Sequence, residues 1–145
     1  IVNSLYLQPD ELEQKVVDRY RNVYDVIKER EVRFESEGIE DADLVLTAYG
    51  ATARVAKNAM KAARAKGYKV GIIRPITLWP FPVAEFQRAA KTAKSFLCVE
   101  MSMGQMVDDV KLAVECAKPV HFFGRTGGII PAPDEILAEI EKILG

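Results

Sequence analysis

The residues with the clearest capacity for chemistry form a short segment rich in glycine near the C-terminus. In Gly124-Arg125-Thr126-Gly127-Gly128, three glycines surround an arginine and a threonine. Backbone N–H groups in such a segment can form a concave site for a phosphate or carboxylate, which makes Arg125, Thr126, Gly127 and Gly128 a candidate anion site. A tight turn, in which the glycines supply positive backbone dihedrals, explains the same residues and is the favoured interpretation. The segment matches neither a Walker A motif nor a GxGxxG motif before a helix, so it is a weak nucleotide motif.

A second group of reactive side chains consists of Arg74, Glu100 and Arg125, which stand at the ends of three apolar runs. If these runs are parallel strands, the three side chains meet at the carboxyl end of one sheet, where ligands usually bind. Glu100 would then be a candidate general base. Flanking arginines would stabilise its ionised form and make it a poor base, so a structural ion-pair cluster is the favoured interpretation. His121, inside the last apolar run, is interpreted as a packed strand residue because no catalytic partner accompanies it.

A row of four cations recurs at helical spacing in the segment after Gly50. The row consists of Arg54, Lys57, Lys61 and Arg64, with no acidic residue at those positions. A solvated outer helix face is the default interpretation. The alternative is a binding face for an acidic partner or a phosphorylated cofactor.

Composition excludes several classes of protein. A net charge of −1 and nearly equal numbers of acidic and basic residues argue against a nucleic-acid or membrane-surface protein. The two cysteines, Cys98 and Cys116, form no CxxC pair, no metal-binding constellation is visible, and Cys98 is expected to be a buried free thiol in a reducing cytoplasm. The sequence shows no run of about 18 apolar residues for a membrane span and no secretory signal. It begins without methionine, which suggests an excerpt from a longer polypeptide.

The elements that must position these side chains follow from hydrophobic periodicity. Apolar residues spaced by four, four, three and four predict an amphipathic helix from Pro9 to about Arg30. Alternation over Glu31 to Glu35 predicts a short edge strand. Unbroken apolar runs then predict buried strands at 44–49, 70–73, 95–99 and 120–123. Helices are expected between them and at the end, at 51–66, 83–93, 104–116 and 133–144.

This order predicts a three-layer α/β/α sandwich whose sheet is largely parallel, with one antiparallel edge strand. We expect residues 1–30 to form an N-terminal linker helix and residues 31–145 to form the α/β domain. Between a strand and a helix, Arg74 to Pro82 holds three prolines, which predict a stiff extended loop. This loop would display Trp79 and Phe81, an arrangement suited to docking onto another surface.

Four segments together resemble the C-terminal domain of the α subunit of 2-oxoacid:ferredoxin oxidoreductases, above all the 2-oxoisovalerate and 2-oxoglutarate members. They are Ala48–Ala53, Arg74–Pro82, Val99–Met106 and Phe123–Pro131. They occur in the family's order and spacing, from about Asp43 to the C-terminus. The helix from Pro9 to Arg30 is similar to the family's linker helix. The resemblance implies a transketolase C-terminal-like fold.

The resemblance also implies a role in oxidative decarboxylation of a 2-oxoacid to acyl-CoA with reduction of ferredoxin. The whole enzymes use thiamine diphosphate, magnesium and iron–sulfur clusters. In this family the thiamine site is built by a preceding pyrimidine domain and by another subunit. No thiamine-binding Gly-Asp-Gly motif, catalytic glutamate or cluster cysteine can be placed on this chain. We therefore expect no catalytic residue and no cofactor bound by this domain, and an isolated domain without activity.

The matched loops would then be structural and interdomain elements, in contact with the preceding domain and other subunits. The predicted interface residues are Arg74, Trp79, Phe81, Glu100, Met101, Met103, Gln105 and Arg125. Two alternatives remain open. In one, the domain binds coenzyme A or another phosphate ligand through Arg125 and the basic helix. In the other, the chain is a standalone assembly or regulatory module.

Overall fold

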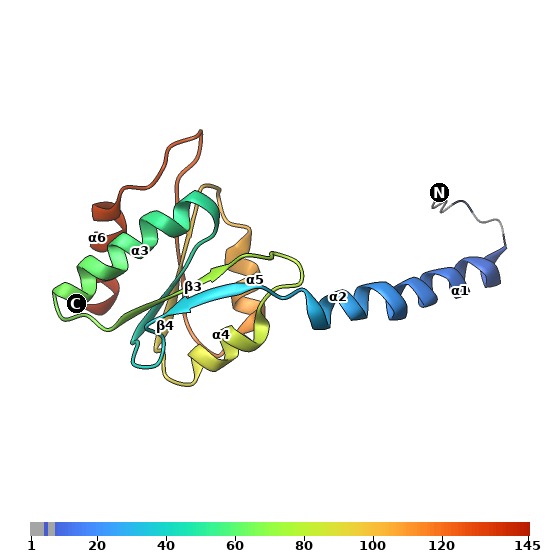
Figure 1. Cartoon of the computed structure of the whole chain (residues 1–145). Helices are drawn as coiled ribbons and strands as arrows, with labels where there is room; N and C mark the ends of the chain where they lie inside the picture. Colours follow the sequence, from blue (N-terminus) through green and yellow to red (C-terminus); the bar gives the residue numbers. More distant parts are fainter. Residues whose placement is uncertain (1–4, 6–7) are drawn as a thin grey trace.

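The computed structural model describes residue 5 and residues 8–145 of the chain, and it shows a five-stranded sheet with helices on both faces (Figure 1). The strand order is β1-β3-β2-β4-β5. β2, β3, β4 and β5 run parallel, and β1 pairs antiparallel with β3. The strands are β1 (Phe34–Glu37), β2 (Leu44–Thr47), β3 (Val70–Pro75), β4 (Ser95–Glu100) and β5 (Val120–Gly124). The predicted α/β/α sandwich with one antiparallel edge strand is confirmed.

Two helices cover each face of the sheet, because the crossovers from β2 and from β4 leave on opposite sides. The helices are α3 (Gly50–Ala65), α4 (Val83–Ala90), α5 (Met106–Ala113) and α6 (Pro133–Leu144). One apolar core lies under α3 and α6, and a second lies under α4 and α5. β2 and β4 are buried along their whole length, which explains why their sequences show no alternation. α5 is shorter than predicted: Gly104 has a positive φ before it, and Glu115 and Cys116 have positive φ after it.

The predicted N-terminal helix forms as α1 (Pro9–Arg19), a π-helical turn η1 (Tyr20–Tyr24) and α2 (Asp25–Arg30). Pro9 occupies the first turn and two acidic residues follow it, as the helix dipole favours. Figure 1 shows this rod extending away from the sheet. None of its described residues is buried. Of the segment predicted as a linker, residues 1–4 and 6–7 lie outside the described residues.

The edge strand begins three residues later than the alternation over Glu31 to Glu35 predicted. Its register pairs Phe34 with Pro75 and Glu37 with Ile72, so its start is set by the end of β3. Before it, the Arg33 N–H donates to Thr77 Oγ1 at 3.0 Å, and this contact leads the chain from the helix into the sheet. The alternation of residue types predicted an edge strand correctly, but the first and last residues of β1 depend on its pairing with β3.

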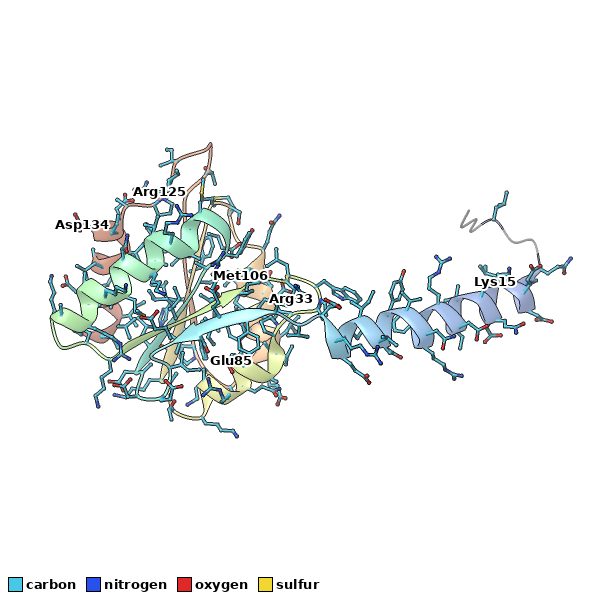
Figure 2. The ribbon with its side chains drawn as sticks, viewed as in Figure 1. Lys15, Arg33, Glu85, Met106, Arg125 and Asp134 are labelled. Atoms are coloured by element: carbon cyan, nitrogen blue, oxygen red, sulfur yellow. The ribbon has the colours of Figure 1, made fainter. Side chains whose placement is uncertain are left out.

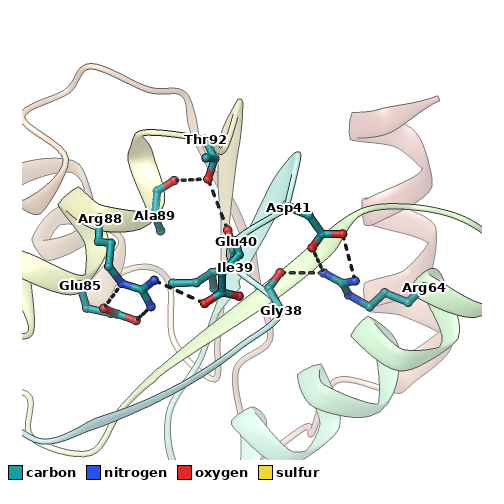
Figure 3. A network of polar contacts seen from close by, with 9 residues as sticks. All are labelled: Gly38, Ile39, Glu40, Asp41, Arg64, Glu85, Arg88, Ala89 and Thr92. Atoms are coloured by element: carbon teal, nitrogen blue, oxygen red, sulfur yellow. Dashed lines mark hydrogen bonds and ion pairs between the residues drawn. The ribbon is translucent and has the colours of Figure 1, made fainter.

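Two arginines from opposite faces of the sheet hold the loop between β1 and β2 (Figure 3). Arg64 of α3 donates to the Gly38 carbonyl at 2.7 Å and to Asp41 Oδ1 at 2.7 Å. From α4, Arg88 pairs with Glu85 at 2.7 Å and with an exposed carboxylate of the loop. The hydrogen bond from Arg88 holds the pKa of Glu85 below its usual value, so this buried carboxylate stays ionised.

Candidate functional site

Glu100 ends β4 and is almost completely buried, with 1% of its surface exposed. Its carboxylate accepts hydrogen bonds from the backbone N–H groups of Gln105 and Met106 at 3.1 Å and of Val107 at 3.0 Å. The Ser102 hydroxyl donates to it at 2.9 Å. These N–H groups lie at the start of α5, where a helix otherwise attracts an anion. The protein's own carboxylate therefore occupies the position that a ligand phosphate takes in many α/β folds.

The thiol of Cys98 lies beside this carboxylate and donates to Glu100 Oε1 at 3.3 Å. Burial, and then the negative charge of Glu100, raises the pKa of the Cys98 thiol far above its usual range. The group is a neutral thiol with no nucleophilic character at physiological pH. The prediction that Cys98 is buried and free is confirmed, and Cys116 is free and exposed.

The predicted ion-pair cluster of Arg74, Glu100 and Arg125 does not form, and this interpretation was wrong. Arg74 pairs with Glu35 at 3.1 Å, and the guanidinium of Arg125 pairs with Glu135. β2 lies between β3 and β4, so Arg74 and Glu100 end strands that are not neighbours. Arg125 does follow the strand next to β4, but only its backbone N–H reaches Glu100, donating to the Glu100 carbonyl at 3.0 Å.

The segment Gly124–Gly128 leads into a tight turn, in which the Ile129 N–H donates to the Thr126 carbonyl at 3.2 Å. Gly127 and Gly128 have φ values of 65° and 82°, the left-handed region that favours glycine. The Arg125 guanidinium, labelled in Figure 2, lies over the Phe123 ring at 5.9 Å and pairs with the first turn of α6. The turn interpretation matches this geometry, and anion binding by these residues stays a prediction.

The loop after β3 displays one of its two aromatic rings. Trp79 is 55% exposed and meets Tyr24 edge-on, with ring centroids 5.9 Å apart. Phe81 instead stacks on Phe86 at 5.0 Å and belongs to the rim of the core. The prediction that the loop displays both aromatics was wrong for Phe81, because the following helix turns that ring inward.

Exposed apolar side chains follow the carboxyl ends of β3, β4 and β5. We call this set the apolar loop residues: Ile76, Leu78, Trp79, Met101, Met103, Ile129 and Ile130. The helical rod adds an exposed stripe of Leu12, Val16, Tyr20, Val23 and Tyr24. Sequence reasoning found Trp79 and the methionines but missed the four aliphatic residues. The available signal was that these residues lie in segments bounded by Pro75, Pro80 and Pro131, since proline disfavours the continuation of a strand.

The four cations at helical spacing in α3 have different surroundings: some make structural contacts and others face solvent. Arg64 holds the β1–β2 loop, and Lys57 pairs with Glu37 at 2.6 Å. Arg54 borders a polar cavity between α3 and the strands β1 and β3. His121 lies in β5 as predicted, but its side chain is exposed rather than packed, because β5 is at the edge of the sheet.

Neither a metal centre nor a membrane span is present in the part of the chain that the structure describes. No group of three or more His, Cys, Asp or Glu side chains there is placed to hold a metal ion. No helix among the same residues is long and apolar enough to cross a membrane.

Comparison with known proteins agrees with this architecture. The ketoisovalerate oxidoreductase subunit VorB of Methanothermobacter marburgensis is 44% identical over 146 residues, which cover 100% of this chain and 41% of the relative. A solved 2-oxoglutarate:ferredoxin oxidoreductase from Magnetococcus marinus matches 97% of this chain and 24% of its own with a TM-score of 0.78 at 22% identity, which shows a shared fold. A split gene transketolase matches 77% of this chain and 41% of its own with a TM-score of 0.62 at 17% identity.

The chain thus spans about two fifths of the length of the curated relative that it matches over its whole extent. The resemblance to oxidoreductase α subunits and the transketolase-like fold, both predicted from four sequence segments, are confirmed. The family described as pyruvate:ferredoxin oxidoreductase core domain II matches residues 42–136. This chain belongs to that family.

Proposed function

We propose that this chain is the C-terminal, non-catalytic domain of the α subunit of a 2-oxoacid:ferredoxin oxidoreductase. Its role is to pack against the thiamine-binding domains and to hold the subunits in register. The observation that carries the proposal is the set of apolar loop residues, with Met103 82% exposed and Trp79 55% exposed. Aromatic residues and methionine are enriched at protein interfaces, and solvent-facing apolar surface of this kind marks a contact site.

The internal geometry of the site supports a structural role. Glu100, the best-placed carboxylate for acid–base chemistry, has its oxygens engaged by the start of α5 and by Ser102. Both oxygens of this carboxylate are thus occupied by the protein's own donors and do not face a substrate. The contacts instead hold the loop from Met101 to Gln105 in one conformation, and Met103 projects from that loop. A preorganised loop loses little conformational freedom on association.

The whole enzyme, under this proposal, oxidises a 2-oxoacid to acyl-CoA and reduces ferredoxin in the cytoplasm. Thiamine diphosphate, magnesium and iron–sulfur clusters are bound by its other domains and subunits. The partners of this domain are the preceding pyrimidine domain of the same subunit and the neighbouring subunits. The proposed contacts extend from Trp79, Met101, Met103 and Gln105 to the apolar stripe of the N-terminal rod. By itself the domain has no activity toward 2-oxoacids.

The test compares two glutamate substitutions in the complete subunit. Met103→Glu places a charge among the apolar loop residues, and Leu112→Glu places the same charge on α5, where Leu112 is 73% exposed. We expect Met103→Glu to lower the fraction of assembled enzyme in native mass spectrometry, because burying an unpaired carboxylate is costly. Leu112→Glu should assemble normally. When each variant is made as an isolated domain, the two should have the same midpoint of thermal unfolding. Normal assembly of Met103→Glu would refute a contact at this loop.

A further inference from the structure

A polar cavity of about 180 Å³ lies between the first half of α3 and strands β1 and β3, at the carboxyl end of β3. Its charged lining consists of Arg54, Lys57, Arg74, Glu35 and Glu37. One bound water needs roughly 10–15 Å³ on the same scale, so the cavity has room for a group of several atoms. Three cations and two carboxylates leave the lining with an excess of one positive charge.

The excess charge can be traced to Arg54. Lys57 pairs with Glu37 at 2.6 Å, and Arg74 pairs with Glu35 at 3.1 Å. These pairs use both carboxylates of the lining, and the ion pairs found among the described residues include none for Arg54. The hydrogen bond from Lys57, together with the nearby cations Lys61 and Arg64, lowers the pKa of Glu37, which reports a positive potential on this side of α3.

A hydrogen-bond donor in the same lining also has no partner. The Nε atom of Arg74 is buried and makes no hydrogen bond within the described part of the chain. A buried donor without an acceptor is unfavourable, and the Arg74 side chain as a whole is 43% exposed, so a turn of its guanidinium toward an oxyanion in the cavity would give Nε an acceptor. The carboxylate of Glu35 engages only the Nη1 side of the same guanidinium.

The N-terminal end of α3 borders this cavity. Gly50, its first residue, belongs to the lining, and its open side has no atom within 4 Å of an added Cβ. The first turn of α3 contains no acidic residue, and no side chain caps it. At α5 and α6, by contrast, Glu100 and Glu135 accept hydrogen bonds from backbone N–H groups at the helix start. The positive end of the α3 dipole therefore reinforces the charge of Arg54.

We propose that this cavity binds a small oxyanion of the phosphate class, either free phosphate or the phosphate group of an ester. Arg54 supplies the uncompensated charge, the guanidinium of Arg74 supplies a donor that lacks a partner, and the start of α3 at Gly50 supplies the positive end of a helix dipole. The site is separate from the Gly124–Gly128 turn, where Arg125 is already paired with Glu135. The proposal does not depend on the interdomain role described above.

The test is a titration of the 145-residue chain, followed by amide NMR at constant ionic strength, with inorganic phosphate in one arm and ribose 5-phosphate in the other. We expect saturable shifts at Gly50, Arg54 and Arg74. Arg54→Gln should weaken binding by about tenfold or more, as expected for loss of a charge-assisted contact. Lys61→Gln removes the same charge from the same helix but outside the lining, so it should weaken binding much less than Arg54→Gln does. Tighter binding in either arm identifies free phosphate or the ester as the ligand.

A gain-of-binding variant keeps the test decisive if Arg54→Gln folds poorly. Glu35→Gln removes one carboxylate from the lining and releases the guanidinium of Arg74, so phosphate should bind more tightly. The proposal is overturned by the absence of saturable shifts in both arms. It is also overturned by equal weakening in Arg54→Gln and Lys61→Gln, or by shifts confined to Gly124–Gly128.

Discussion

Glu100 is a carboxylate that acts as an anion already bound at the start of α5. Its position directly after a buried strand is typical of a catalytic or ligand-binding acid in α/β folds. Its contacts show a different use, because one oxygen accepts from Val107 and the other accepts from Met106 and Ser102. A residue in a catalytic position can thus serve to shape the loop beside it.

Replacing Glu100 by alanine removes the acceptor for three backbone N–H groups at the start of α5. We expect the free energy of unfolding, measured by urea denaturation, to fall by at least about 3 kcal/mol, because three buried donors lose their acceptor and each costs roughly 1–3 kcal/mol. The control is Asp108→Ala, which removes a carboxylate that is 72% exposed and paired with Lys111 on the same helix. Its loss should stay below about 1 kcal/mol. Equal losses in the two variants would contradict the assigned role of Glu100.

At the scale of elements, α3 and α4 lie on opposite faces of the sheet, and each contributes an arginine to the β1–β2 loop. Arg64 also donates to the Val70 carbonyl at 2.6 Å, so one side chain joins α3, the loop and the start of β3. The β1–β2 loop packs closely against β3, since a Cβ at Gly71 would lie 2.6 Å from the Gly38 carbonyl oxygen. These contacts hold β1, whose four residues are all exposed, against the sheet.

Arg64→Met keeps most of the apolar stem of this side chain and removes its donors. We expect it to lower the free energy of unfolding by about 1–3 kcal/mol, because the Gly38 and Val70 carbonyls lose a partly buried donor. Lys61→Met on the same helix is the matched control, and its effect should stay within about 0.5 kcal/mol. Urea denaturation of both variants measures the difference. If the two variants unfold alike, β1 does not rely on Arg64.

At the scale of the whole molecule, the N-terminal rod and the α/β domain differ in what supports them. The domain has two buried cores, whereas the described residues of α1, η1 and α2 are all at least partly exposed. A helix without tertiary contacts is only weakly stable in water, since most helical stability in proteins comes from packing. The C-terminal part of the rod meets the domain, where Tyr24 contacts Trp79.

We therefore expect backbone amides from Glu11 to Tyr24 to exchange with deuterium far faster than those of β2, β3 and β4 in the chain by itself. Local stability follows buried contacts, and the rod has few of them. Hydrogen exchange with mass spectrometry at two protein concentrations measures this and controls for self-association. In the complete subunit the same amides should become protected. Strong protection in the dilute isolated chain would contradict the view that the rod needs a partner.

Much of this architecture could be predicted, because the burial of a strand or helix leaves a pattern of apolar residues in the local sequence. Runs such as Leu44–Thr47 are apolar on both faces because helices cover both sides, and the spacing over Pro9 to Arg30 is that of one helix face. The positive φ of Gly127 and Gly128 likewise agrees with a turn expected from glycine alone. The four family segments also needed no coordinates, since their order along the chain carries the resemblance.

By itself the sequence determined the class of fold and the approximate positions of the strands and α-helices, because each depends on residues close together in the chain. The order of four segments along the chain also determined the family. The tertiary structure decided the partners of Arg74, Glu100 and Arg125, because the sheet order places β2 between β3 and β4. It also decided that Phe81 turns inward while Trp79 stays exposed. Ion pairs and ring contacts depend on separations of a few ångströms between distant residues, and no local pattern encodes those distances.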